Sequence, residues 1–258
     1  MREAAAAPRP DDTGAPDEQK KVHRAEPKTR TSAEAKREGP TLDTIKADPR
    51  VKTYIRSANQ QTGAIGYTEH GERHANTSAD GARFILKSLG HDARRCEVAA
   101  VAAYLHDIGN VITRESHGQT GALLSEAILV DNGFELEEVA TIMGAIANHE
   151  ESEGGLPVSA VSAAVIIADK SDVHRSRVRK TGHIDHDIHD RVNYAVEQSF
   201  LRVDSDARTV SLELTIDTQI SQVMEYFEIF LGRMQLCRRA AEMLDARFRL
   251  VVNGSELA

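Results

Sequence analysis

The chain has 258 residues, of which 40% are hydrophobic, enough to bury a core in one domain or in one domain with a small companion. No segment approaches the roughly 20 consecutive apolar residues that span a membrane, and the first residues lack the long apolar region of a secretory signal, so we expect a cytoplasmic protein with no membrane partner. The net charge of −8 argues against general nucleic-acid binding.

The composition divides the chain into three parts. Residues 1–40 are rich in Ala, Pro and charged side chains and have almost no large apolar ones, which predicts a disordered segment. The spacing of apolar residues predicts a helical domain over residues 41–198 and a small α+β subdomain over residues 199–258. We therefore expect a mainly α fold, in which a helical bundle is followed by a small C-terminal α+β part with the element order ββαβ.

The central part contains five predicted helices that bear on function. Their apolar residues recur with helical spacing, and Gly, Asn, Asp and Pro residues separate them. The helices cover Asn76–Leu89, Ala93–His106, Thr120–Val130, Glu135–Asn148 and Ser159–Ala168. The second helix is apolar throughout Val98–Leu105, which is typical of a helix in the core.

Histidines and aspartates at the ends of these helices are candidate metal ligands. Neutral imidazoles and carboxylates bind borderline and hard divalent cations, and each of these side chains is carried by a rigid support. Six of them indicate a site for one or two divalent ions. The six are His74, His106, Asp107, His117, His149 and Asp169.

Each candidate also has a simpler interpretation. His106 could interact with a helix dipole while Asp107 caps the next turn. His117 could belong to an ordinary loop before a helix, and His149 could be a solvated helix end. His70, which precedes the first candidate by four residues, is expected at the surface. The ordered series as a whole favours metal binding by the six candidates.

The pattern changes in the C-terminal part. Ser199–Val203 and Thr209–Thr215 are predicted to be the strands of a hairpin, and Phe248–Val252 a third strand. A long helix within Thr218–Leu244 carries an apolar stripe with alternating spacings of three and four residues. The stripe either covers the small sheet, which we favour, or forms the interface of a homo-oligomer.

The candidate ligands occur in local sequences that resemble those of a known family. In chain order these sequences are HANTSADGA, AAYLHDIGN, HGQTGALLSEAIL, GAIANHE and IIADKSD. Together they resemble the HD-domain superfamily of metal-dependent phosphohydrolases, and they match its six-ligand, binuclear type. The resemblance covers Gly66–Val173 and implies an HD-domain helical bundle.

The resemblance also implies how two ions would share the ligands. One ion would be held by the first two histidines of the series and by Asp169, and the other by His117 and His149. Asp107 would bridge the two ions together with a shared hydroxide. Two cations about 3.5–4 Å apart can acidify a bridging water and neutralise charge that develops on a phosphoryl group. The metal could be Fe, Mn, Mg, Zn or Ni.

One departure from the family pattern concerns the substrate. Many relatives continue the His-Asp pair as His-Asp-x-Gly-Lys, whereas this chain has Asn110 at the position of the lysine. Lys170 or Arg175 could instead supply positive charge to a phosphate, although a basic run is also typical of a solvated turn. The candidate catalytic residues are therefore Asp107, Lys170 and Arg175.

These features favour a metal-dependent phosphohydrolase that directs a metal-activated hydroxide at a phosphomonoester or phosphodiester, with a small phosphorylated molecule, most plausibly a nucleotide, as the substrate. The first alternative is a di-iron oxygenase, because some superfamily members use the same six ligands to activate dioxygen. The second is a noncatalytic ligand-binding module that a metal stabilises.

Overall fold

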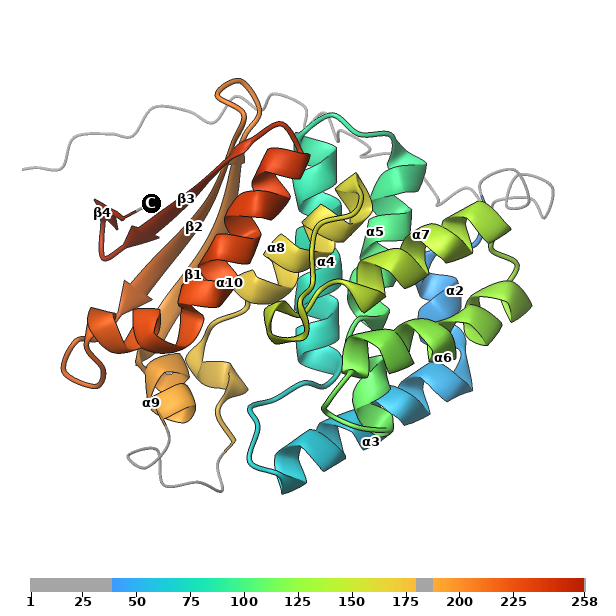
Figure 1. Ribbon diagram of the computed structural model, residues 1–258, viewed down its shortest axis with the longest axis horizontal. Coiled ribbons are helices and arrows are strands. Elements are labelled where there is room, and N and C mark those ends of the chain that lie inside the picture. The colour runs from blue at the N-terminus through green and yellow to red at the C-terminus, as the bar shows by residue number, and fades with distance from the viewer. Residues whose placement is uncertain (1–38, 180–187, 258) are drawn as a thin grey trace, which may run out of the picture.

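The computed structural model describes residues 39–179 and 188–257. The prediction of disorder for residues 1–40 falls, apart from residues 39 and 40, outside the described residues. The described chain is mainly helical and carries a small four-stranded sheet near its C-terminus, so the predicted fold class is confirmed (Figure 1). None of the described helices is both long enough and apolar enough to cross a membrane.

The helical bundle surrounds one central helix. Its α-helices are α2 (Leu42–Ala47), α3 (Pro49–Ala64), α4 (Glu72–Ser88), α5 (Ala93–Leu105), α6 (His117–Asp131), α7 (Leu136–Ala147) and α8 (Ala160–Ser171). Every residue from Val98 to Leu105 in α5 is at most 5% exposed, because α2, α4, α7 and α8 all pack against this helix. The alanine-rich sequence of α5 lets its neighbours approach closely.

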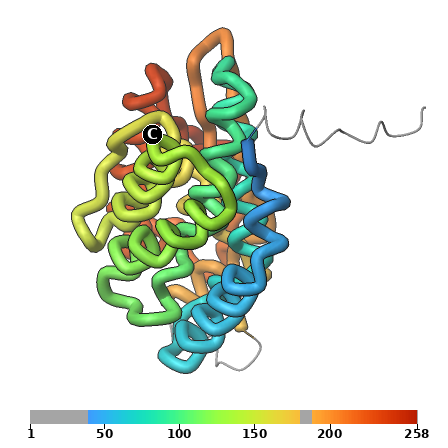
Figure 2. Tube along the Cα trace, turned by 90° about the vertical axis from the view of Figure 1, so that its right-hand side faces the viewer, coloured from blue at the N-terminus to red at the C-terminus, as the bar shows by residue number. Residues whose placement is uncertain are grey.

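Three short 3₁₀ helices connect the longer ones. They are η1 (Ile108–Val111), η2 (Glu151–Glu153) and η3 (Arg175–Arg177). Both α3 and α6 pack on η1. Helices α6 and α7 also pack against each other. Figure 2 shows the α2–α3 segment, in blue to cyan, along one side of the bundle. The residues after α5 are therefore enclosed by helices from both sides.

Three helix ends lie about one turn away from the predicted positions. Helices α4 and α6 begin earlier, at Glu72 and His117, and α8 continues to Ser171. The added turns contain polar residues that contact other elements, as when Arg73 donates to Asp172 at 2.8 Å. Apolar periodicity does not detect such turns, because long-range polar contacts hold them.

The C-terminal part is a sheet with a long helix, α10, packed against it and a short helix, α9, before its first strand. It comprises α9 (Ile188–Ala195), β1 (Val196–Asp204), β2 (Thr209–Ile216), α10 (Val223–Met243), β3 (Arg247–Val252) and β4 (Ser255–Glu256). The strand order is β1-β2-β3-β4; β2 and β3 are parallel and joined through α10, and the other neighbours are antiparallel. The sequence did not predict β4, which is only two residues long and follows a tight turn at Asn253-Gly254.

Helix α10 packs between the sheet and the bundle (Figure 1). The buried residues of its stripe include Phe230, Met234, Cys237 and Ala241. Helix α10 contacts β3 on one side and α8 on the other, so the apolar stripe packs against other parts of the same chain. Association of two copies through Thr218–Leu244 stays a prediction.

The importance of the close packing of α4 can be measured with a matched pair of substitutions. Leu86 in α4 is fully buried, whereas Leu123 in α6 is 66% exposed. We expect Leu86→Ala to lower the free energy of unfolding by about 2–5 kcal/mol, because it removes buried surface and leaves a cavity. Leu123→Ala should change it by no more than about 0.5 kcal/mol. Equal losses in chemical denaturation would contradict the described packing.

Candidate metal centre

Five helix ends meet at one place and bring the six predicted ligands together. His74 lies in the first turn of α4, and His117 is the first residue of α6. His106 and Asp107 follow the last residue of α5, His149 follows α7, and Asp169 lies in the last turn of α8. All six side chains are nearly buried, with residue exposures between 1% and 8%.

The first group of ligand atoms contains two imidazoles and two carboxylates. The Nε2 atoms of His74 and His106 are 3.1 Å apart, and they lie 3.2 and 3.5 Å from Oδ1 of Asp169. Oδ2 of Asp107 lies 3.6 Å from the first nitrogen and 3.3 Å from the second. Ligand atoms about 2.1 Å from one cation are about 3.0–3.4 Å apart in octahedral or tetrahedral coordination. The four atoms therefore fit around one divalent cation.

The second group lies on the other side of Asp107. The Nε2 atoms of His117 and His149 are 3.0 Å apart, and they lie 3.4 and 4.0 Å from Oδ1 of Asp107. Oε2 of Glu150 lies 3.8 Å from His117 Nε2, so it could serve the same position. Asp107 thus directs one carboxylate oxygen to each group, as a carboxylate that bridges two cations must.

Hydrogen bonds orient all four imidazoles. Each Nδ1 faces a carbonyl or carboxylate oxygen and must donate its proton, which leaves Nε2 with its lone pair toward the centre. The acceptors are Asp172 Oδ2 for His74 at 2.6 Å, Ala103 O for His106 at 2.6 Å, Arg114 O for His117 at 3.0 Å and Ile146 O for His149 at 2.7 Å. When both imidazoles of a pair are neutral, their Nε2 lone pairs, only about 3 Å apart, repel each other, and a proton or a metal cation between them removes the repulsion.

The charges of the site also favour cations. Burial alone lowers the pKa of His106, but Asp107 and Asp169 outweigh it and raise this pKa to about 10. Burial raises the pKa of Asp107 and Asp169, yet nearby cationic groups hold both well below the usual range. Oδ2 of Asp107 is buried and accepts no hydrogen bond within the described residues. A buried ionised oxygen in this position requires positive charge beside it, which His106 at 3.3 Å supplies while it is protonated and which a divalent cation would supply on displacing that proton.

The segment after the His-Asp pair is shaped to hold Asp107. The buried amide of Asn110 donates to Oδ1 of Asp107 at 3.0 Å, so the residue at the expected lysine position fixes the carboxylate of Asp107. At Gly109, a Cβ atom would lie 2.0 Å from the carbonyl oxygen of His117. Only glycine allows η1 to pack this closely on α6.

Sequence reasoning missed several groups around the ligands. The expectation that His70 is at the surface was wrong, because His70 is only 9% exposed and its ring lies 5.7 Å from that of His74. Its spacing of four residues from His74 was the available signal. Glu150 is 5% exposed beside His117, although its acidic neighbours suggested a solvated helix end.

The predicted phosphate-binding cations have other partners. Nζ of Lys170 lies 3.0 Å from Asp169, 2.8 Å from Glu151 and 3.6 Å from Glu150, and the side chain is 2% exposed. Arg175 lies away from this cluster: it pairs with Glu197 at 3.1 Å and stacks over Tyr194. The structure therefore brings Lys170, but not Arg175, to the metal ligands.

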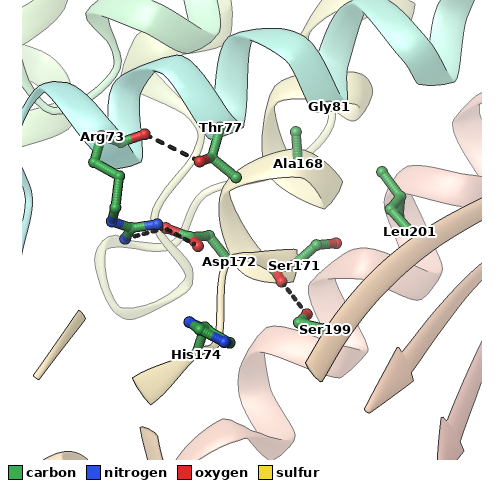
Figure 3. Close-up of a pocket in the computed structure, with 9 residues that line it drawn as sticks. All are labelled: Arg73, Thr77, Gly81, Ala168, Ser171, Asp172, His174, Ser199 and Leu201. Atoms are coloured by element: carbon green, nitrogen blue, oxygen red, sulfur yellow. Dashed lines mark hydrogen bonds and ion pairs between the residues drawn. The ribbon is translucent and has the colours of Figure 1, made fainter. Parts of the chain in front are cut away.

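A small pocket of about 240 Å³ lies between α4, α8 and β1 (Figure 3). Arg73 and Asp172 form its polar end, and Gly81 and Leu201 line the apolar part. Asp172 also accepts the hydrogen bond from His74, which does not line the pocket. The pocket therefore borders the group that orients one ligand rather than the ligands themselves.

Comparisons with known proteins show what the chain is similar to. The family model described as HD domain matches residues 72–175. An uncharacterized protein of Methanocaldococcus jannaschii is 26% identical over 208 residues, which cover 71% of this chain and 79% of that protein. A second similarity is to the crystal structure of a predicted HD superfamily hydrolase from an uncultured Thermotogales bacterium. The two sequences are 23% identical, the aligned part covers 56% of this chain and 75% of that protein's chain, and the TM-score is 0.41. The match to the family model identifies residues 72–175 as an HD domain.

Two groups of ligands predict two ions per chain. We expect His117→Ala to lose one ion and retain the other, since the group formed with His74 stays complete. His91→Ala, a substitution outside both groups, should retain two. Elemental analysis after dialysis against Mn²⁺ measures these ratios. A wild-type ratio of one, or two ions in His117→Ala, would contradict the division of the ligands.

Proposed function

We propose that the chain is a metal-dependent phosphohydrolase that acts on a small phosphomonoester or phosphodiester, with nucleotides as the substrate class. The observation that carries this proposal is the position of Asp107, whose Oδ2 belongs to one ligand group and whose Oδ1 belongs to the other. The donor set of imidazoles and carboxylates suits Fe, Mn, Zn or Ni, and Mg is the least favoured because it prefers oxygen.

Bound divalent cations would acidify a shared water near neutral pH and offset the charge that develops on a phosphoryl group. The residues of the chain hold this arrangement in place. Asp107 sets the separation of the two groups, and Asn110 fixes its carboxylate. The hydrogen bonds to Nδ1 prevent the imidazoles from turning away, and the surrounding helices limit the access of bulk water.

Arg114 is the residue that we propose to contact the substrate phosphate. Its guanidinium lies 3.4 Å from Asn110 Oδ1, 3.4 Å from His117 Nε2 and 3.4 Å from Glu150 Oε2. These contacts are long, and the side chain is 18% exposed, so Arg114 can turn toward an anion. Lys170 has no such freedom, because three carboxylates surround its ammonium.

An aromatic ring next to Arg114 supports a nucleotide substrate. The guanidinium lies 4.9 Å from the centre of the Tyr67 ring, and Tyr67 is 43% exposed. The arginine could hold a phosphate while the free part of the ring offers a face on which a base can stack. This pair places a charged contact and a flat apolar contact side by side at the metal centre.

A panel of nucleotides, cyclic dinucleotides and nitrophenyl phosphoesters tests the proposed reaction. We expect metal-dependent release of phosphate or nucleotide that a chelator abolishes and added metal restores. Asp107→Asn keeps the size of the side chain but removes its charge, and should lower kcat by at least about 100-fold. Full activity in Asp107→Asn would contradict the mechanism. Anaerobic assays separate hydrolysis, which oxygen does not affect, from an oxygenase reaction, which would overturn the proposal.

The role of Arg114 is tested against a matched arginine. Losing a charge-assisted contact worth about 1.5–3 kcal/mol should lower kcat/KM of Arg114→Gln by about 10- to 100-fold, with metal content unchanged. Arg175→Gln removes an arginine that pairs with Glu197 and should leave kcat/KM unchanged. Both variants are assayed on the best substrate of the panel. If Arg175→Gln lost kcat/KM and Arg114→Gln did not, Arg175 rather than Arg114 would be the residue that contacts the phosphate.

A further inference from the structure

A row of alternating charges connects the C-terminal helix to the metal centre. Nε of Arg233, on α10, donates to Oε1 of Glu151 at 3.0 Å. Oε2 of Glu151 lies 2.8 Å from Nζ of Lys170, and Nζ lies 3.0 Å from Oδ2 of Asp169. Oδ1 of Asp169 belongs to the first ligand group. The row therefore begins in the C-terminal subdomain and ends on a metal ligand.

The inner members of the row are shielded from water. The side chain of Lys170 is 2% exposed, and those of Glu151 and Arg233 are 21% and 22% exposed. The guanidinium of Arg233 also lies 4.7 Å from the centre of the Phe230 ring, which restricts its position. Burial alone would lower the pKa of Lys170, but the carboxylates beside it raise the pKa and keep it charged. A buried charge of this kind depends on each of its partners.

The row determines where the carboxylate of Asp169 can lie. One of its oxygens faces the imidazoles of His74 and His106, and the other is held by Lys170. Lys170 in turn takes its position from Glu151, which Arg233 anchors. A shift of α10 would therefore reach Asp169 through three polar contacts. Helix α10 lies outside residues 72–175, so the HD segment alone does not contain this support.

We propose that Arg233 and Glu151 are positioning residues for the metal centre, and that the C-terminal subdomain thereby sets the affinity of the group that contains Asp169. The group formed by His117 and His149 meets the row less directly, through Glu150, whose Oε2 lies 3.6 Å from Nζ of Lys170, whereas Asp169 is itself a member of the row. Loss of the row should therefore weaken one of the two metal sites selectively. This inference concerns metal binding and does not depend on which reaction the centre catalyses.

Calorimetric titration of the metal-free, full-length chain with Mn²⁺ tests the proposal. His74→Ala identifies the binding step that belongs to the Asp169 group. We expect Arg233→Gln to weaken that step by about 10-fold, the lower end of the effect of groups that support ligands, and to leave the other step unchanged. Arg233→Lys, which retains the positive charge, should recover most of the loss.

Two controls on α10 separate positioning from general destabilisation. Arg238→Gln removes an exposed arginine of the same helix and should change neither step. Leu236→Ala removes a side chain that is 4% exposed, and should lower the Tm without changing the affinity of either step. If Arg233→Gln lowered the Mn²⁺ affinity of both binding steps, or of neither, the proposal would be overturned.

Glu151→Gln provides an independent variant and decides the question if Arg233→Gln does not fold. It preserves the shape of the side chain while removing the charge between Arg233 and Lys170, and the same selective loss is expected. Unchanged Mn²⁺ binding in this variant would refute the proposal. Absence of phosphoester hydrolysis would refute the proposed function instead, because the titration does not involve a substrate.

Discussion

The carboxylate of Asp107 is the constraint on which the site depends. It is ionised, nearly buried and placed between two pairs of imidazoles, with one oxygen toward each pair. A negative charge in such surroundings is stable only beside positive charge. Two divalent cations would supply this positive charge. Their total charge would exceed the negative charge of the two ligand carboxylates. The excess favours anions, such as hydroxide and the phosphate of a substrate.

The fold serves this arrangement through the convergence of helix ends. Helix α5 is buried on all sides from Val98 to Leu105 and delivers Asp107 to the interior, where Gly109 allows η1 to pack directly on α6. The ligands come from five different helices, so small changes in packing would change the distances among them. Support from α10 through Arg233 extends this dependence to the C-terminal subdomain.

The sequence predicted the mainly α fold and located the ligand-bearing helix ends to within about one turn, because both follow from local patterns. It did not predict the surroundings of the ligands, which depend on contacts between distant residues. Asp172 supports His74 across 98 positions of the chain, and the buried state of His70 depends on neighbouring elements. The carboxylates that pair with Lys170 come from η2 as well as from its own helix. The sequence therefore does not reveal whether this ammonium is available to a substrate or already paired within the chain.

If two cations bind at this site, Asp107 should bridge them. Anomalous diffraction from crystals grown with Mn²⁺ tests this expectation most directly. We expect two anomalous peaks about 3.5–4 Å apart, one beside each oxygen of Asp107, with His74 and His106 near the first and His117 and His149 near the second. A single peak, or two peaks without Asp107 between them, would contradict it.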